Sequence, residues 1–329
     1  MSDDWQPTAC ILCECNCGIV VQTSVQDGAG HLAKIRGDKD HPGSQGYTCN
    51  KALRLDHYQN NSARLTSPQR RRPDGSYEEI DWDTAITEIA AGFTRIAETY
   101  GGNKIFYYGG GGQGNHLGGA YSNAFLKPLG SRYRSNALAQ EKTGEYWVDA
   151  HLYGGHTRGE FKHAEVSVFV GKNPWMSQGF PQARTVLNEI AKDPTRAMIV
   201  IDPVLTDTAK MADFHLRVKP GADAWALAAL AAVLVQENLC NETFLAEHVD
   251  GDATVRDVLR SVPIDDYAER SGVDGELLRA AARRIGAADS VAVFEDLGVQ
   301  QAPNSTLCSY LNKLLWILTG SFAKRGGQH

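Results

Sequence analysis

The chain has 329 residues, of which 42% are hydrophobic, and it carries a formal net charge of −6 at pH 7. This length and composition are typical of a globular protein with a sizeable core and room for two domains, and the charge gives no reason to expect nucleic-acid binding. The longest apolar run, Ala224–Val235, falls short of the roughly 18 residues of a membrane span. The first residues contain no basic or apolar signal segment, which predicts a cytoplasmic protein.

Four cysteines dominate the N-terminal region. Cys10, Cys13 and Cys17 follow one another with two and three residues between them, and Cys49 comes 31 residues later. Zinc and iron–sulfur clusters favour thiolate ligands, and a 4Fe–4S cluster is held by four of them. Three close cysteines and one distant cysteine favour such a cluster. Cys15 lies in the same run and leaves open a register shifted by one ligand.

Structural zinc is the competing interpretation of these cysteines. Zinc ribbons usually carry two C-x2-C pairs, whereas here only Cys10 and Cys13 form such a pair. A disulfide framework is disfavoured by the odd total of 7 cysteines and by the absence of a secretory signal. Structural thiols without a ligand are the third interpretation.

The first part of the chain is predicted to form a small domain. Residues 1–60 are rich in Cys, Gly and His, and Ile19–Thr23 alternates as a hairpin strand does. A basic run then extends from Arg64 to Pro73, which is typical of a solvated connector and less often of a surface for an anionic cofactor or an acidic partner. We therefore predict an iron–sulfur domain over 1–65 and an α/β region over 66–329.

The second region alternates between strands and helices. Asp83 is expected to cap a helix that stops at Gly101 and Gly102. The expected strands are 104–108, 166–170, 198–201, 215–218 and 291–294, and the later helices are 224–236, 276–285 and 307–318. This alternation predicts a parallel α/β sheet. The predicted fold class is thus α/β, a small Cys-rich iron–sulfur domain followed by a parallel-sheet, Rossmann-like region.

Polar residues follow several of these strands. Gln113, Asn173, Asp202 and Asp223 all come just beyond a predicted strand. Ligands of open α/β sheets bind at this carboxyl edge, where glycines allow close approach and helix N-termini attract phosphate. Each loop alone is more typical of a structural turn, and Gly109–Gly112 matches neither common phosphate-binding motif. Several such loops on one edge favour a nucleotide site.

With these features in hand, the chain resembles the bis(molybdopterin guanine dinucleotide) oxidoreductases of molybdenum or tungsten, the dimethyl-sulfoxide-reductase superfamily that includes formate dehydrogenases and nitrate reductases. The similarity runs over essentially the whole chain as the N-terminal portion of such an enzyme. Its motifs occur in order: Cys10 to Lys51, Arg64–Pro68, Asp81–Asp83, Gly171–Pro174, Ile201–Pro203, Pro220–Asp223 and Leu318–Gly320.

The resemblance implies specific roles. Cys10, Cys13, Cys17 and Cys49 would hold the 4Fe–4S cluster, and Lys51 would lie between cluster and pterin as a catalytic relay residue. The residues expected to contact the pterin guanine dinucleotide are Gln113, Gly171, Asn173, Pro174, Asp202, Thr206, Gly221 and Asp223.

Two features depart from the family pattern. The position where other members place a protein ligand to the metal falls near Ala137, which cannot coordinate, and Ser135 or Glu141 would serve only in a shifted register. The chain also stops at His329, where family members continue for several hundred residues. We therefore expect a fragment or one half of a split enzyme with apolar surface that the other part would bury.

The resemblance implies a two-electron oxidation or oxygen-atom transfer on a small substrate, with electrons relayed through the cluster. The alternatives are a non-redox Mo/W enzyme such as a hydratase, an electron-transfer or binding subunit with an incomplete metal site, and a zinc-stabilised module. The expected partners are a small-molecule substrate and either an electron-transfer protein or a complementary C-terminal half. The histidines at 116, 151, 156 and 163 are expected to be structural, with a proton shuttle as the alternative.

Overall fold

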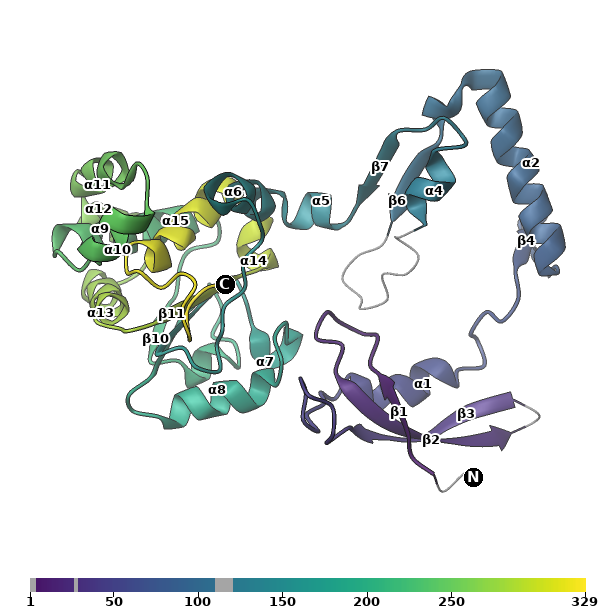
Figure 1. Cartoon of the computed structure of the whole chain (residues 1–329), viewed down its shortest axis with the longest axis horizontal. Coiled ribbons are helices and arrows are strands. Elements are labelled where there is room, and N and C mark those ends of the chain that lie inside the picture. The colour runs from purple at the N-terminus through teal and green to yellow at the C-terminus, as the bar shows by residue number, and fades with distance from the viewer. Residues whose placement is uncertain (1–3, 27–28, 110–120) are drawn as a thin grey trace. The chain divides into compact units, whose positions relative to one another are not determined.

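The computed structural model describes residues 4–26, 29–109 and 121–329 (Figure 1). The chain forms two compact units. The first comprises Met1–Ala137 with Phe180–Gln182, and the second comprises Leu138–Gly179 with Ala183–His329. Among the described residues, no helix has both the length and the apolar character needed to cross a membrane.

The first unit begins with an antiparallel sheet of β1 (Gln6–Ala9), β2 (Gly18–Gln26) and β3 (Ala29–Gly37), in that order. The predicted strand Ile19–Thr23 lies within β2 and is confirmed. A short 3₁₀ turn, η1 (Ala52–Arg54), leads into α1 (Leu55–Gln59). Asn60 ties the end of α1 to β3, because its amide donates to the Leu32 carbonyl at 2.9 Å and accepts from the Leu32 N–H at 3.0 Å.

The remainder of this unit contains α2 and a second, parallel strand pair. β4 (Gln69–Arg71) pairs with β5 (Tyr77–Glu79), and α2 (Trp82–Tyr100) follows. After η2 (Gly102–Lys104), β6 (Phe106–Gly109) pairs in parallel with β7 (Tyr133–Asn136). α4 (Ser122–Leu126) lies between them in sequence.

The predicted cap of α2 was wrong by two residues. Asp81 caps the helix, and its Oδ1 accepts from the Thr84 N–H at 2.7 Å. An N-cap acceptor must lie two or three residues before the N–H that it binds, and Asp83 is already inside the helix. The predicted end before Gly101 is confirmed. Ile86 and Ile89 of α2 remain 60% and 55% exposed among the described residues.

The second unit is built on a four-stranded parallel sheet in the order β10-β9-β8-β11. Its strands are β8 (Val166–Val170), β9 (Ala197–Ile201), β10 (Phe214–Leu216) and β11 (Val291–Glu295). The predicted strands at 166–170, 198–201 and 291–294 are confirmed. The expected strand 215–218 ends earlier, because the Val218 N–H turns back to the Leu216 carbonyl at 3.0 Å.

Helices bury both faces of this sheet. All residues of β8, β9 and β11 are buried, which explains their unbroken apolar sequences. α9 is buried over most of its surface and packs in the central core with α15 and the sheet. The helices are α5 (Leu138–Glu141), α6 (Thr143–Tyr153), α7 (Pro174–Ser177), α8 (Ala183–Lys192), α9 (Asp223–Gln236), α10 (Glu242–His248), α11 (Asp252–Arg260), α12 (Ile264–Ser271), α13 (Gly275–Gly286), α14 (Leu297–Gln300) and α15 (Ser305–Ile317), with η3 (Ala209–Met211) before β10.

Candidate cofactor-binding sites

Three of the four predicted cysteine ligands lie on one tight loop between β1 and β2. The Cys10 N–H donates to the Cys17 carbonyl at 2.8 Å and closes the loop, while the Asn16 N–H donates to the Cys13 carbonyl at 3.2 Å. Asn16 takes a positive φ of 43°, a conformation that asparagine tolerates better than most residues. Cys49 lies in the segment before η1 and packs against the small hydrophobic core that includes Cys10.

The electrostatics show that these thiols share one site. Burial, together with smaller contributions from the charges of Cys13, Cys10 and Cys49, raises the pKa of Cys17 to about 11. Burial also raises the pKa of Cys10, with smaller contributions from Cys13 and Cys49. A hydrogen bond from Cys15 is the main reason that the pKa of Cys13 falls to about 6. The four predicted ligands therefore lie close enough together for their thiolate charges to interact.

The predicted relay residue lies at the same site. Lys51 is an exposed residue immediately before η1. Its ammonium charge lowers the pKa of both Cys10 and Cys13, although other contributions are larger. A cation in this place stabilises the negative charge that four thiolates bring together.

The donor set fits an iron–sulfur cluster better than a single zinc ion. Zn–S bonds of about 2.3 Å place tetrahedral sulfurs only about 3.8 Å apart. Within the described ranges, the three ligand atoms that come within 4.8 Å of one another belong to Glu145, Asp149 and His156, and no such group contains cysteine. No three of the described cysteine sulfurs thus lie within 4.8 Å of one another, which disfavours a preformed tetrahedral zinc site.

The predicted nucleotide-binding residues lie at the carboxyl edge of the sheet in the second unit. Gly171 follows β8, and Asn173 and Pro174 open α7. Asp202 and Thr206 follow β9, while Gly221 precedes α9 and Asp223 is its first residue. Gln113 lies outside the described residues.

The loop after β8 is held in a fixed conformation. The Thr208 hydroxyl donates to the Asn173 Oδ1 at 2.7 Å and accepts from the Trp175 N–H at 3.1 Å. Gly171 has a φ of +58°, and a Cβ there would lie 2.6 Å from the Val299 backbone nitrogen. Only glycine allows this approach. Thr208 is fully buried and was not predicted, because its partners are 33 and 35 residues away in sequence.

A cleft of about 460 Å³ opens beside the start of α9. Asp223 is only 5% exposed, so burial raises the pKa of its carboxyl, and the charge of Asp202 raises it further. A carboxylate in this setting is suited to accept from an N–H edge such as that of guanine. The residues present therefore fit a guanine nucleotide. The cleft is lined by Pro203, Pro220, Gly221, Asp223, Leu297, Gly298, Gln301, Ala302 and Pro303.

Ala137 immediately follows β7 in the first unit, at the carboxyl edge of the β6–β7 pair, where Gly109 and Asn136 are partners. Ser135 is a strand residue opposite Tyr108, and Glu141 ends α5. The methyl group of Ala137 offers no donor atom for a metal.

Several charged residues in the interior of the second unit were not predicted. Lys313 of α15 is 3% exposed, and Glu145 and Asp149 of α6 are 5% and 1% exposed. A single lysine within the apolar stretch 307–318 was the one local signal in the sequence, because lysine is almost never fully buried without a partner.

Comparison with known proteins agrees with this geometry. The family "Molybdopterin oxidoreductase" matches residues 64–320, and the family "Molybdopterin oxidoreductase Fe4S4 domain" matches residues 3–61. The probable oxidoreductase YyaE of Bacillus subtilis (strain 168) is 28% identical over 90% of this chain and 44% of that protein. The assimilatory nitrate reductase catalytic subunit of the same organism is 27% identical over 98% of this chain and 45% of that protein.

The solved structure of acetylene hydratase from Pelobacter acetylenicus has the same fold. It matches with a TM-score of 0.82 and 24% identity over 98% of this chain and 44% of that chain. The present chain thus spans less than half the length of these relatives. The predicted fold class, a small iron–sulfur domain followed by a parallel α/β region, is confirmed.

The family match covers more than half of the chain and agrees with the order of the motifs, the four-cysteine site and the sheet-edge cleft. The cofactors that go with it are a 4Fe–4S cluster and a molybdopterin-bound molybdenum or tungsten. The chain belongs to the molybdopterin oxidoreductase family.

Proposed function

We propose that this chain is the cofactor-binding portion of a molybdenum or tungsten oxidoreductase that carries out a two-electron oxidation or an oxygen-atom transfer on a small substrate. The observation that carries the proposal is the pairing of a four-cysteine site next to Lys51 with an acidic cleft at the carboxyl edge of a parallel sheet. The first element suits electron relay, and the second suits the nucleotide of the pterin.

Each site has a defined part in this proposal. Cys10, Cys13, Cys17 and Cys49 hold the cluster, and Lys51 stabilises the added electron by its positive charge. The pterin-bound metal, when present, supplies the two-electron chemistry. Asp223 and Asp202 accept from the guanine edge, while the backbone around Gly171 and the fixed Asn173–Thr208 pair orient the nucleotide. Pro174, Thr206 and Gly221 shape the loops, and Gln113 is the further proposed contact.

The proposed domain boundary lies at 65/66. The two family matches end at residue 61 and begin at residue 64, which supports a division in that region. Because the chain covers only part of each relative's length, we propose that a complementary C-terminal half or an electron-transfer protein completes the system, together with the small substrate.

Anaerobic purification of the chain tests this proposal. Broad absorption near 400 nm with about four irons per chain is expected for the cluster. Acid hydrolysis should release GMP from the bound pterin nucleotide. One zinc with no iron would support the zinc-stabilised module instead. Iron without GMP would support an electron-transfer subunit with an incomplete metal site.

A second candidate is a non-redox reaction at the metal, such as hydration. Ala137 leaves it open, because its methyl group at the end of β7 offers no donor atom to the metal. The two candidates differ in their need for an electron acceptor. Turnover of a small substrate by the completed enzyme without any acceptor or donor would favour hydration.

A further inference from the structure

Lys313 lies at the centre of a buried ionic network in the second unit. It forms an ion pair with Glu295 of β11, and its Nζ lies 3.4 Å from Oδ1 of Asp149 on α6. All three side chains are at most 4% exposed. Glu295 is held further by Ser309, whose hydroxyl donates to it at 2.8 Å.

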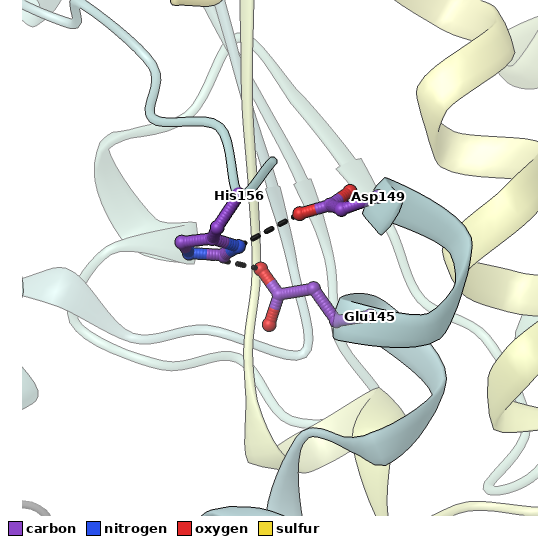
Figure 2. A group of neighbouring side chains, drawn as sticks. All are labelled: Glu145, Asp149 and His156. Carbon is purple, nitrogen blue, oxygen red and sulfur yellow. Dashed lines mark hydrogen bonds and ion pairs between the residues drawn. The ribbon is translucent and has the colours of Figure 1, made fainter. Parts of the chain in front are cut away.

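His156 closes one end of this network. Figure 2 shows its ring facing the carboxylates of Glu145 and Asp149, which project from the same helix one turn apart. The His156 Nδ1 lies 2.7 Å from the Asp149 Oδ2, and its Nε2 lies 3.9 Å from the Glu145 Oε1. The other oxygen of each carboxylate is occupied, because Lys142 donates to Glu145 at 3.2 Å and Tyr153 donates to Asp149 at 2.8 Å.

The other end of the network reaches the ligand edge of the sheet. Lys142 also lies 3.2 Å from Asp296, the residue that follows β11. Asp296 in turn forms an ion pair with Lys172, which sits between Gly171 and Asn173. An unbroken series of charged contacts therefore connects His156 to the loop after β8.

The network has one negative charge too many. Four carboxylates face three ammonium groups; the acids are Glu145, Asp149, Glu295 and Asp296, and the bases are Lys142, Lys172 and Lys313. An unbalanced buried charge is costly, so the arrangement favours binding of one further positive charge. A single proton makes the network neutral, whereas a divalent metal ion would leave it with one excess positive charge.

The surroundings of each carboxyl group indicate which of them binds that additional proton. Burial raises the pKa of Glu145, and the charge of Glu295 raises it further. Although burial opposes the shift, the His156 hydrogen bond and the Lys313 charge hold the pKa of Asp149 below its usual value. Burial likewise opposes the shift at Asp296, but Lys172 and Lys142 keep its pKa low. Glu145 and His156 are thus the two groups of the network that can bind the additional proton. The aromatic ring of Tyr146 packs against the His156 imidazole.

We propose that Glu145 and His156 together hold one exchangeable proton and act as a proton store for the sheet-edge cofactor site. The proton resides on the Glu145 carboxyl or the His156 Nε2, and its transfer between them leaves the total charge unchanged. When a reaction at the sheet edge takes a proton from Lys172, the ammonium is restored through Asp296 and Lys142. The pair then carries one proton fewer until it is refilled from solvent.

The store itself is tested by infrared and NMR spectroscopy of the full chain. We expect a protonated-carboxyl stretch and a His156 ring signal that respond to each other as the pH is varied. Glu145→Gln should abolish the carboxyl band and leave the His156 ring neutral, because the charges then balance. His156→Gln should keep the band, since the proton stays on Glu145. Glu189→Gln, an exposed control on α8, should change neither signal.

Several results would overturn the store. One is a carboxyl band that persists in Glu145→Gln. Another is a wild-type chain that shows neither a protonated carboxyl nor a protonated His156. Saturable binding of Zn²⁺ that is lost in both variants would assign the group to a metal instead. If Glu145→Gln does not give a native circular dichroism spectrum, the retained band in His156→Gln decides the question.

The delivery role rests on the proposed function and is tested separately. In the loaded, completed enzyme, Glu145→Gln should remove one limb of the pH profile of kcat while iron and GMP contents stay at wild-type levels. An unchanged pH profile overturns delivery but leaves the store intact. Loss of iron or GMP from the wild-type chain would instead count against the proposed function, and the spectroscopic result would still stand.

Discussion

The Lys313 ammonium and the Glu295 carboxylate form an ion pair in the interior of the second unit, where their side chains are only 4% and 2% exposed. Burial opposes the charge on Lys313, but Glu295, Glu145 and Asp149 together raise its pKa above the ordinary value. The pair joins α15 to β11, beneath the edge where the cofactor cleft lies. Removing either side chain would leave the other as a buried charge without its ion-pair partner.

Lys313→Met should therefore destabilise the chain by about 3–5 kcal/mol, because it leaves buried carboxylates without their cation. Denaturant unfolding of anaerobically purified protein, followed by circular dichroism, measures the change. Lys210→Met removes an exposed ion pair with Asp207 and should cost less than about 1 kcal/mol. Equal losses in the two variants would show that the buried pair has no special role.

Cys15→Ser should retain wild-type iron content, whereas Cys17→Ser should lose the cluster. The reason is that Cys10, Cys17 and Cys49 act on one another's charge, while Cys15 serves as a hydrogen-bond donor to Cys13. Iron analysis and absorption spectroscopy under anaerobic conditions give the readout. Iron lost from the Cys15 variant but kept in the Cys17 variant would establish the shifted register.

Lys51→Gln should leave the iron content unchanged and make the cluster harder to reduce. A positive charge beside the cysteines favours the reduced cluster, so its removal shifts the reduction potential to a more negative value. Redox titration followed by electron paramagnetic resonance measures that shift. Lys34→Gln, at an exposed position of β3, is the matched control and should have little effect. A potential unaltered by Lys51→Gln contradicts the relay role.

Asp223 should make stability depend on pH in an unusual direction. Because burial raises its pKa in the folded chain, the folded state binds the proton more tightly than the unfolded state. Its contribution therefore favours folding at low pH and is lost as the pH rises from the ordinary carboxyl pKa of 3.8 through the raised pKa of the folded state.

Asp223→Asn is accordingly expected to stabilise the cofactor-free chain at pH 7 while lowering its GMP content. Denaturant unfolding at several pH values measures the first effect, and acid hydrolysis of purified protein measures the second. A variant with lower stability and full GMP content would show that Asp223 has a structural role alone.

Gly171→Ala should cost about 1–3 kcal/mol, because it combines a positive φ with a close backbone contact at Val299. Gly92→Ala provides the contrast. Gly92 lies inside α2 with no atom within 4 Å of an added Cβ, so alanine should stabilise by about 0.5–1 kcal/mol. Thermal unfolding of both variants distinguishes the cases, and a Gly171 variant as stable as the wild type would contradict the close approach.

Much of the fold was predictable because its signals are local. The unbroken apolar runs of β8, β9 and β11 are required by burial on both faces of a parallel sheet, and they are visible in the sequence. The cap of α2 was misplaced because Asp81 and Asp83 both precede apolar positions, and only backbone geometry distinguishes them. Asn173 was recognisable from its motif, but its partner Thr208 was not, since no short-range pattern links residues 35 positions apart.

The sequence by itself determined the four-cysteine spacing, the adjacent Lys51 and the order of strands and polar loops, because each depends on residues close together in the chain. The tertiary structure decided which charges meet in the interior. Lys313 lies on α15, Glu295 on β11, and Asp149 and His156 on α6 and the loop after it. The contacts of Lys313 with Glu295 and Asp149 exist only once α6 and α15 have packed on the sheet. Folding removes these groups from water, so each must find an opposite charge, and that need leaves no periodic trace in the sequence.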